Sequence, residues 1–427
     1  MKFLIKNGRV VDPKSNTDET LDILIEDGKI ADLKARIESK DATRIDASRL
    51  VVAPGFIDMH VHLRVPGQEH KETIETGTRA AAKGGFTSIC AMPNTSPVND
   101  DPNVTNDILA QAERRAIVNL YPIGALTKGL LGAEPADMAG LVKAGAVAFS
   151  DDGKCIQNSR VMRQVLECSK SLGTLVIDHC EDKSLSENGV MHDGAASLRF
   201  GLGGIPAAAE DIMVARDIIL AESLDTRVHI AHLSTKGAVH LVREAKKRKV
   251  KITAEATPHH IVLNDGYLKN FETNYKVNPP LRSPEDVQAL IGAVKDGTVD
   301  VFATDHAPHT AKEKNVALDK APFGMVGLET AVSLLLDRLV GKNVISLARF
   351  IEMISTKPAQ LLGLKNKGQI TVGADADLTI LNLRQEVVVD VRAFSSKSKN
   401  SPFDGWKLKG APVMTIVAGK IVYPFAG

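Results

Sequence analysis

Short apolar runs alternate with longer amphipathic stretches over most of the chain. Eight of the runs have the length of strands, and polar or turn residues mark their ends. The runs occupy residues 51–62, 87–93, 119–126, 146–153, 175–182, 227–234, 251–260 and 299–308. Helical spacing of apolar residues is found between them, for example at 72–83, 158–172, 207–222 and 285–294. Strands alternating with helices are typical of a parallel α/β sheet, and eight such units predict a closed (β/α)8 TIM-like barrel.

The two ends of the chain have a different pattern. Residues 2–52 consist of short alternating segments separated by turns, and residues 377–381 and 417–422 repeat this pattern. We expect both termini to pair in a small β-sandwich subdomain beside the barrel. The expected division of the chain is 1–52, 53–365 and 366–427, with the barrel in the middle.

Composition and charge narrow the possible partners. The chain has 427 residues, with 53 Lys+Arg against 52 Asp+Glu, so its formal net charge of +1 gives no electrostatic footprint for nucleic acid. No apolar run is long enough for a membrane span or a signal-peptide core. The four cysteines form no Cys-x-x-Cys pair, which indicates reduced thiols, and Cys155 and Cys180 are interpreted as small core residues. We therefore expect a cytoplasmic protein without a nucleic-acid or membrane partner.

Metal-ligand and acid-base side chains are concentrated at the ends of the predicted strands. In a β/α barrel all these ends open onto one face, which is where the active sites of this fold lie. The residues at these positions are His60, His62, Asp152, His179, His232 and Asp305.

The pair His60 and His62 is the first sign of a metal site. Residues two apart on a strand point to the same side, so both imidazoles can bind one ion. A lone His-x-His pair is weak evidence, but His179 and His232 each end another predicted strand, and Asp152 adds a carboxylate. This mixture of nitrogen and oxygen ligands suits zinc, and a central carboxylate can bridge two ions.

Three further residues are candidates for catalysis and substrate binding. Asp305 ends the eighth run and is the best candidate for a general acid-base group. Arg64, two residues beyond His62, can bind a carboxylate through its planar guanidinium, and Asn94 lies in a Met-Pro-Asn-Thr segment after the second run.

These residues lie in segments that resemble a known family. Residues 55–64 (GFIDMHVHLR) and 303–309 (ATDHAPH) are similar to the two signatures of dihydroorotases, in the amidohydrolase superfamily. The similarity extends over nearly the whole chain. Supporting segments are 92–95, 149–153, 179–182, 232–234, 257–260, 276–282 and 322–324.

The resemblance implies a role for each candidate. One zinc ion would be bound by His60 and His62 and the other by His179 and His232, with Asp152 between them and Asp305 as the acid-base residue. The substrate-binding residues that the resemblance implies are Arg64, Asn94 and His309 for a carboxylate, and Asn278, Phe323 and Gly324 for the pyrimidine ring. The implied reaction is the reversible closure of N-carbamoyl-L-aspartate to dihydroorotate.

The bridging group distinguishes this chain from many relatives. Hydantoinases and some dihydroorotases use a carboxylated lysine at the end of the fourth strand, but the nearest lysines here, Lys143 and Lys154, lie outside that strand end. The chain therefore resembles the aspartate-bridged type. A shift of one residue would exchange Asp151 and Asp152, and only the resemblance favours Asp152.

Several alternatives and details stay open. An allantoinase or hydantoinase would share the barrel and metals, and a non-catalytic homologue would act as a scaffold. His259 and His260 are interpreted as structural, residues 310–321 as a charged lid loop, and residues 395–400 as a surface loop. The resemblance further suggests a homodimer and an association with aspartate transcarbamoylase.

Overall fold

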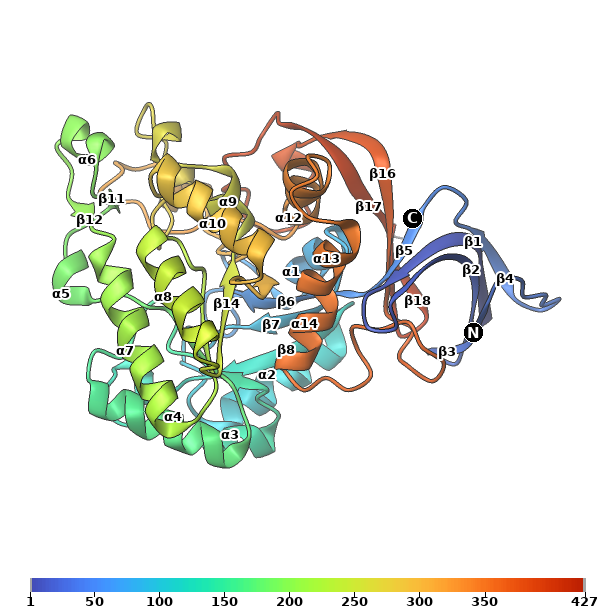
Figure 1. The fold of residues 1–427 in the computed structure, drawn as a ribbon, viewed down its shortest axis with the longest axis horizontal. Coiled ribbons are helices and arrows are strands. Elements are labelled where there is room, and N and C mark those ends of the chain that lie inside the picture. Colours follow the sequence, from blue (N-terminus) through green and yellow to red (C-terminus); the bar gives the residue numbers. More distant parts are fainter. Residues whose placement is uncertain (1, 425–427) are drawn as a thin grey trace.

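A barrel of parallel strands forms the larger part of the molecule (Figure 1). The structure is a computed structural model that describes residues 2–424. The barrel sheet has the strand order β15-β14-β13-β10-β9-β8-β7-β6. Its strands are β6 Phe56–Val61, β7 Phe86–Ala91, β8 Asn119–Gly124, β9 Ala148–Phe149, β10 Val176–Asp178, β13 Val228–Ile230, β14 Ile252–Ala256 and β15 Val301–Phe302. Each overlaps one of the eight predicted runs, so the predicted barrel is confirmed, although its strands are shorter than the runs.

Backbone contacts beyond the named strands join the two ends of this sheet. Val61 forms a parallel bridge with His306, and the backbone N–H of His62 donates to the carbonyl oxygen of His306 at 2.9 Å. The first strand therefore meets the segment after the last strand. This contact brings residues 60–62 and 305–309 together at the carboxyl-end rim of the barrel.

Helices surround the barrel, and their ends carry the expected capping residues. Helix α10 (Pro284–Asp296) begins with a capping box. The Ser283 side chain accepts from the Asp286 N–H, and the Asp286 carboxylate accepts in return from the Ser283 N–H. Helix α4 ends at Gly173 in the left-handed conformation, φ 69°. The longer helices are α1 Ile74–Lys83, α2 Pro102–Arg115, α3 Met138–Ala144, α4 Ser159–Leu172, α7 Ala208–Leu224, α8 Lys236–Lys247 and α10 Pro284–Asp296.

Shorter elements connect and cover these units. The short helices are α5 Lys183–Ser186, α6 Ala195–Phe200, α9 Pro258–Val262, α11 Ala311–Lys314, α12 Ala331–Leu335, α13 Leu347–Ile351 and α14 Lys357–Leu361. Two π-helical segments, Leu336–Val340 and Glu352–Thr356, continue α12 and α13. Strands β11 Met191–His192 and β12 Gly204–Ile205 form a separate pair. Among residues 2–424, no helix has both the length and the apolar character needed to cross a membrane.

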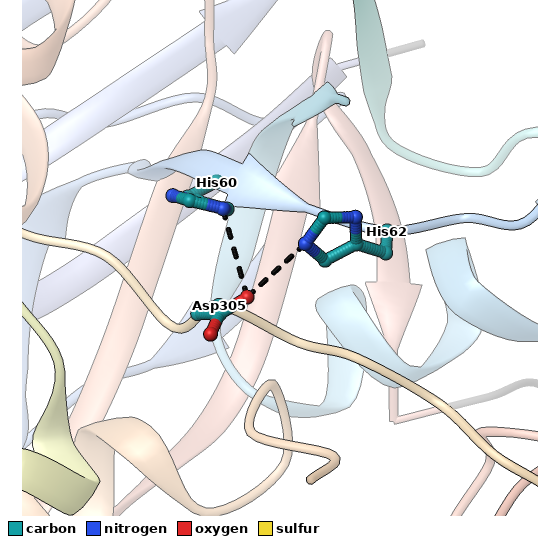
Figure 2. Close-up of side chains that lie close together, drawn as sticks. All are labelled: His60, His62 and Asp305. Atoms are coloured by element: carbon teal, nitrogen blue, oxygen red, sulfur yellow. Dashed lines mark hydrogen bonds and ion pairs between the residues drawn. The ribbon is translucent and has the colours of Figure 1, made fainter. Parts of the chain in front are cut away.

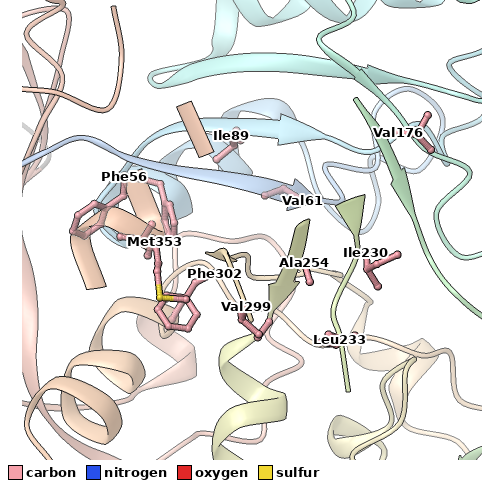
Figure 3. Packing of buried hydrophobic residues seen from close by; sticks show 14 of the residues in the cluster. Phe56, Val61, Ile89, Val176, Ile230, Leu233, Ala254, Val299, Phe302 and Met353 are labelled. Atoms are coloured by element: carbon pink, nitrogen blue, oxygen red, sulfur yellow. The ribbon is translucent and has the colours of Figure 1, made fainter. Parts of the chain in front are cut away.

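Branched and aromatic side chains fill the core between strands and helices (Figure 3). Phe56 at the start of β6 contacts Phe350 edge to face, with ring centroids 5.7 Å apart, and both rings are fully buried. Burial of one such side chain contributes about 1.5–3 kcal/mol. The packed core holds the strand ends rigidly, which in turn fixes the rim residues.

Both termini contribute to a second sheet, on the right of Figure 1. Its order is β18-β17-β16-β5-β1-β2-β3, with β4 against β1. Its strands are β1 Lys2–Asp12, β2 Thr17–Glu26, β3 Lys29–Lys34, β4 Thr43–Asp46, β5 Val51–Pro54, β16 Leu378–Val388, β17 Lys407–Val417 and β18 Lys420–Tyr423. The pairing of β5 with β16 joins the two ends of the chain, as the sequence pattern predicted. The limits of the three predicted domains stay a prediction.

The first predicted run is divided between the two sheets at Gly55. Residues 51–54 belong to the terminal sheet as β5, and β6 begins the barrel at Phe56. A Cβ atom at Gly55 would lie 2.2 Å from the Thr87 Oγ1 atom, so only glycine fits at this junction.

The sequence predicted that residues 395–400 form a surface loop, and this prediction is only partly correct. Ser396, Ser398 and Asn400 are buried, whereas Lys397 and Lys399 between them are exposed. The buried side chains bond to the rim: Ser396 donates to Glu72, and Asn400 Nδ2 donates to the Ala307 carbonyl oxygen at 3.1 Å. Alternating burial thus makes this segment part of the rim's support.

Candidate metal centre and substrate pocket

The six candidate metal and acid-base residues converge at the carboxyl-end rim. His60 and His62 lie at the end of β6, and the other four residues each follow a different strand. All six are buried. Their exposed fractions are 0% for His60, 4% for His62, 5% for Asp152, 2% for His179, 1% for His232 and 7% for Asp305.

Four imidazole rings surround the carboxylate of Asp152. The Nε2 atoms of His60 and His62 lie 3.3 Å from its Oδ1 and Oδ2 atoms, respectively. On the other side, His179 Nδ1 is 3.6 Å and His232 Nε2 is 3.5 Å from Oδ1. One carboxylate therefore stands between two pairs of histidines.

Asp305 approaches the first pair of histidines from the last strand, as Figure 2 shows. Its Oδ1 atom lies 3.1 Å from His62 Nε2 and 3.6 Å from His60 Nε2. Burial opposes ionisation of this carboxyl group, but the hydrogen bond from His62 and the charge of His60 lower its pKa to about 2. Asp305 is therefore a carboxylate at neutral pH and can accept a proton.

Asp151 points away from the histidines. Its Oδ1 atom accepts from the backbone N–H groups of Leu126, at 2.8 Å, and Thr127, at 3.0 Å, and Oδ2 accepts from the Thr127 hydroxyl. Burial raises the pKa of Asp151 to about 6. The register of the fourth strand thus turns Asp152 toward the histidines and uses Asp151 to hold the neighbouring loop.

The outward nitrogens of three histidine rings bind polar side chains behind the cluster. His60 Nδ1 is 2.7 Å from Glu255 Oε1, and His179 Nε2 is 2.9 Å from Glu181 Oε2. His62 Nδ1 is 2.9 Å from Asn94 Oδ1. In a neutral ring, the form that binds a metal ion, a carbonyl or carboxylate oxygen at one ring nitrogen fixes the proton there and leaves the other nitrogen with its lone pair. The nitrogens with free lone pairs then face Asp152.

The ring nitrogens and carboxylate oxygens that face the centre of the cluster are arranged as ligands for metal ions. His60 Nε2 and Asp152 Oδ1 are buried and have no partner of hydrogen-bond geometry among residues 2–424. His179 Nδ1 and His232 Nε2 lie 2.9 Å apart, a hydrogen bond in which only one of the two nitrogens can be the donor. Two overlapping groups of ligand atoms gather within 4.8 Å: His60, His62 and Asp305, and His60, Asp152 and His232. Imidazole nitrogens with carboxylate oxygens are a donor set that zinc accepts.

A pocket of about 200 Å³ opens beside this cluster. Its lining contains all six residues that the sequence suggested for substrate binding, together with six residues of the cluster and the rim. The residues are His62, Arg64, Asn94, Asp152, Gly153, His179, Asn278, Asp305, Ala307, His309, Phe323 and Gly324.

The pocket combines a buried cation with a neutral histidine. Burial lowers the pKa of Arg64 to about 10, so the guanidinium keeps its charge at neutral pH. His309 Nε2 is 3.3 Å from Arg64 Nη2, and burial together with this neighbouring charge lowers the pKa of His309 to about 2. Arg64 adopts a positive φ of 62°, which turns it sharply away from β6 into the pocket wall. The site therefore offers a fixed positive charge opposite the histidine cluster.

The support residues Glu255 and Glu181 were not singled out from the sequence. Glu255 lies in the buried strand β14, where it also accepts from the His232 N–H at 3.1 Å and contacts His229 Nε2 at 3.2 Å. A carboxylate inside an otherwise apolar parallel strand is the signal that could have identified Glu255. Glu181 lies two residues after His179 in the sequence, but nothing there shows that its side chain turns back onto the His179 ring.

The remaining histidines lie outside the cluster. His260 Nδ1 is 2.7 Å from the hydroxyl of Thr257, the N-cap of α9, and His260 Nε2 is 2.9 Å from the Pro279 carbonyl oxygen. His306 Nε2 pairs with Glu72 at 3.2 Å. The thiols of Cys155 and Cys180 are buried beside Asp178, which itself pairs with Arg216 at 3.0 Å.

Comparison with known proteins gives the class to which this barrel and site belong. A model of the amidohydrolase family matches residues 322–423, and a model described as dihydro-orotase-like matches residues 48–238. Among solved structures, L-hydantoinase from Arthrobacter aurescens is similar with a TM-score of 0.89 and 29% identity, over 98% of this chain and 95% of that one. A dihydropyrimidinase from Brevibacillus agri has a TM-score of 0.85 and 26% identity, over 99% and 95% of the two chains. The fold and the histidine-carboxylate site therefore define an amidohydrolase.

Sequence relatives identify the family within this class. Proteins named dihydroorotase are 54% identical in Pelotomaculum thermopropionicum and 51% identical in Acetivibrio thermocellus, over 98% or more of both chains in each case. Another, from Bacillus cytotoxicus, is 48% identical over 99% of this chain and 98% of its own. The chain belongs to the dihydroorotase family.

Proposed function

We propose that this protein is a zinc-dependent dihydroorotase, which converts N-carbamoyl-L-aspartate reversibly to (S)-dihydroorotate and water in pyrimidine biosynthesis. The observation that carries the proposal is the pocket in which a buried Arg64 faces the histidine-carboxylate cluster. The substrate has a free carboxylate and a cyclic amide, so it needs a cation at one end of the pocket and an activating centre at the other. The identity of about 50% to proteins named dihydroorotase supports the same reaction.

Two zinc ions are the proposed cofactor. His60 and His62 would hold one ion, His179 and His232 the other, and the Asp152 carboxylate would bridge them, as the positions around Asp152 suggest. When bound, such ions supply Lewis acidity that polarises a carbonyl group and makes water acidic enough to react at neutral pH.

Asp305 is the proposed proton carrier. In the hydrolytic direction, water adds to the ring carbonyl carbon, Asp305 accepts the proton of that water, and the ring C–N bond breaks. Asp305 then delivers the proton to the leaving nitrogen, which restores the carboxylate. Its low pKa, held down by His62 and His60, keeps it ionised before the proton transfer. The reverse sequence closes the ring.

Arg64, Asn94 and His309 are the proposed ligands of the substrate carboxylate. Since Asn94 Oδ1 accepts from His62 Nδ1, the Nδ2 group of that amide is the part left to donate to substrate. Asn278, Phe323 and Gly324 would line the ring. Asn278 Nδ2 is held by Glu181 Oε2 at 2.9 Å, which fixes its amide.

A hydantoinase-type activity is the second candidate, because the similar solved structures include an L-hydantoinase with a TM-score of 0.89. The test is to assay purified protein on dihydroorotate, N-carbamoyl-aspartate, allantoin and hydantoins, with zinc content measured on the same sample. Preference for dihydroorotate with about two zinc ions per chain supports the proposal. Preference for a ring without a carboxylate would refute it, and a protein without zinc or turnover would indicate a scaffold.

We further propose a cytoplasmic homodimer. Helix α7 exposes Ile212 and Ile219, at 49% and 63%, on the outside of the barrel, where apolar side chains favour contact with another chain. The proposed association with aspartate transcarbamoylase rests on the family resemblance alone. Light scattering of the purified protein, alone and mixed with that enzyme, tests both assemblies.

A further inference from the structure

Two buried lysines connect the segments that form one side of the substrate pocket. Lys276 and Lys314 are 3% and 5% exposed, which is unusual for ammonium groups. Lys276 lies two residues before Asn278 of the pocket, and Lys314 ends helix α11 in the loop that follows His309. Neither lysine lies in direct contact with the histidine cluster. Their burial therefore calls for another explanation.

Lys314 binds backbone carbonyl groups from both segments. Its Nζ atom donates to the Thr273 oxygen at 3.0 Å and the Pro322 oxygen at 2.8 Å, and the Lys276 oxygen is 3.4 Å away. In return, Thr273 Oγ1 donates to the Lys314 carbonyl oxygen at 2.6 Å. Since residues 273–276 and residue 322 belong to different loops, a single ammonium group links the two.

Lys276 makes the reciprocal connection. Its Nζ atom donates to the carbonyl oxygens of Leu318, at 2.7 Å, and Asp319, at 3.2 Å. The same ammonium lies 4.6 Å from the centre of the Phe323 ring, and the Gly324 N–H donates to the Lys276 carbonyl oxygen at 2.9 Å. Phe323 and Gly324 are pocket residues, so this second contact ends at the pocket wall.

We propose that Lys276 and Lys314 are positioning residues, which clamp the loop of residues 310–322 onto the segment 273–278 and so set the width of the substrate pocket. A lysine amino group has two or three N–H donors, and here they bind carbonyl oxygens from both segments. The clamp fixes the position of Asn278 relative to Phe323 and Gly324, which line the same pocket. The loop is thus held against the segment that carries Asn278.

This inference rests on the proposed function for its kinetic part, but its structural part is independent. If the clamp fails, the loop opens and the substrate-binding residues separate, while the histidine cluster, which belongs to other strand ends, keeps its geometry. The loss should therefore appear in substrate binding rather than in the chemical step.

The test replaces each lysine by methionine, which keeps most of the side-chain volume but removes the donors and the charge. For Lys276→Met and Lys314→Met we expect the KM for dihydroorotate to rise about 5- to 50-fold, with kcat and zinc content near those of the parent. Limited proteolysis within residues 310–322 should become faster in both variants. Lys314→Arg, which keeps a charged donor, should show a smaller rise in KM than Lys314→Met.

Lys320→Met is the matched control, since Lys320 lies in the same loop with its side chain 78% exposed. It should leave KM and proteolysis unchanged. Loop proteolysis and KM that stay at parental values in folded Lys276→Met and Lys314→Met would overturn the clamp. Equal losses in kcat and zinc content would also overturn it, because they indicate general destabilisation. If the parent protein does not act on dihydroorotate, the proposed function fails, and proteolysis still decides whether the clamp exists.

Discussion

Glu255→Gln tests whether the support behind the histidines determines metal affinity. Glu255 is fully buried, and it accepts from His60 Nδ1 at 2.7 Å and from the His232 N–H at 3.1 Å, while its other oxygen contacts His229 Nε2 at 3.2 Å. Burial opposes its ionisation, but the neighbouring His60 and His229 hold its pKa below the usual range. Glu255 is therefore an anion that fixes the His60 tautomer and orients His232.

The substitution keeps the shape of the side chain but removes the charge and one acceptor. A hydrogen bond to a charged group contributes about 1.5–3 kcal/mol, against about 0.5–1.5 kcal/mol for a neutral one. The difference, about 1–1.5 kcal/mol, corresponds to roughly a 10-fold weaker hold on zinc. This agrees with the 10- to 100-fold effect that is typical of such supporting carboxylates, as an order of magnitude.

The assay is a titration of the zinc-loaded protein with a chromophoric chelator, combined with circular dichroism to verify folding. Glu72→Gln is the matched control, because Glu72 is equally buried and pairs with His306 at 3.2 Å outside the cluster. We expect the zinc affinity of Glu255→Gln to be about 10-fold lower than that of the parent, and the affinity of Glu72→Gln to be unchanged. Parental zinc affinity in folded Glu255→Gln, or the same loss in Glu72→Gln, would refute the reasoning.

Three further outcomes are expected. Asp305→Asn should keep its zinc but lose at least about 100-fold in kcat, because the proton carrier is gone; near-parental turnover with zinc in place would exclude the role. Arg64→Ala should raise the KM about 10- to 100-fold in steady-state assays, through loss of a charged hydrogen bond worth about 1.5–3 kcal/mol, and an unchanged KM would contradict carboxylate binding. Burial lowers the pKa of Lys314 to about 7 from 10.5, so between these values the unfolded chain binds more protons and stability rises with pH. Between pH 7 and 9.5 this rise is about 3 kcal/mol, and urea unfolding should show that Lys314→Met lacks it. An equal rise in both proteins would contradict the lowered pKa.

Hydrophobic periodicity in the sequence was sufficient to predict the barrel. The eight runs each overlap a barrel strand, because buried parallel strands are nearly continuous in apolar residues and their helices repeat at a different period. Periodicity did not predict where strands end. It placed 51–62 in one run, whereas close contact with Thr87 makes Gly55 the junction between two sheets.

The candidate site was also predictable in outline, because ligand-type residues at strand ends must meet on one face of a closed barrel. The structure brings His60, His62, Asp152, His179 and His232 together as expected, and their roles as ligands stay a prediction. Which of two adjacent aspartates faces the histidines was not decided by composition or spacing. Only the backbone donors of Leu126 and Thr127, which hold Asp151, decide it.

Local pattern therefore determined the elements of this protein and the chemical character of its rim. Tertiary structure alone decided the contacts between residues that are far apart in the sequence, such as Glu255 with His60 and Lys314 with Thr273. The physical reason is that a hydrogen bond depends on direction and on a distance of about 3 Å, whereas hydrophobic periodicity specifies only which face of an element is buried.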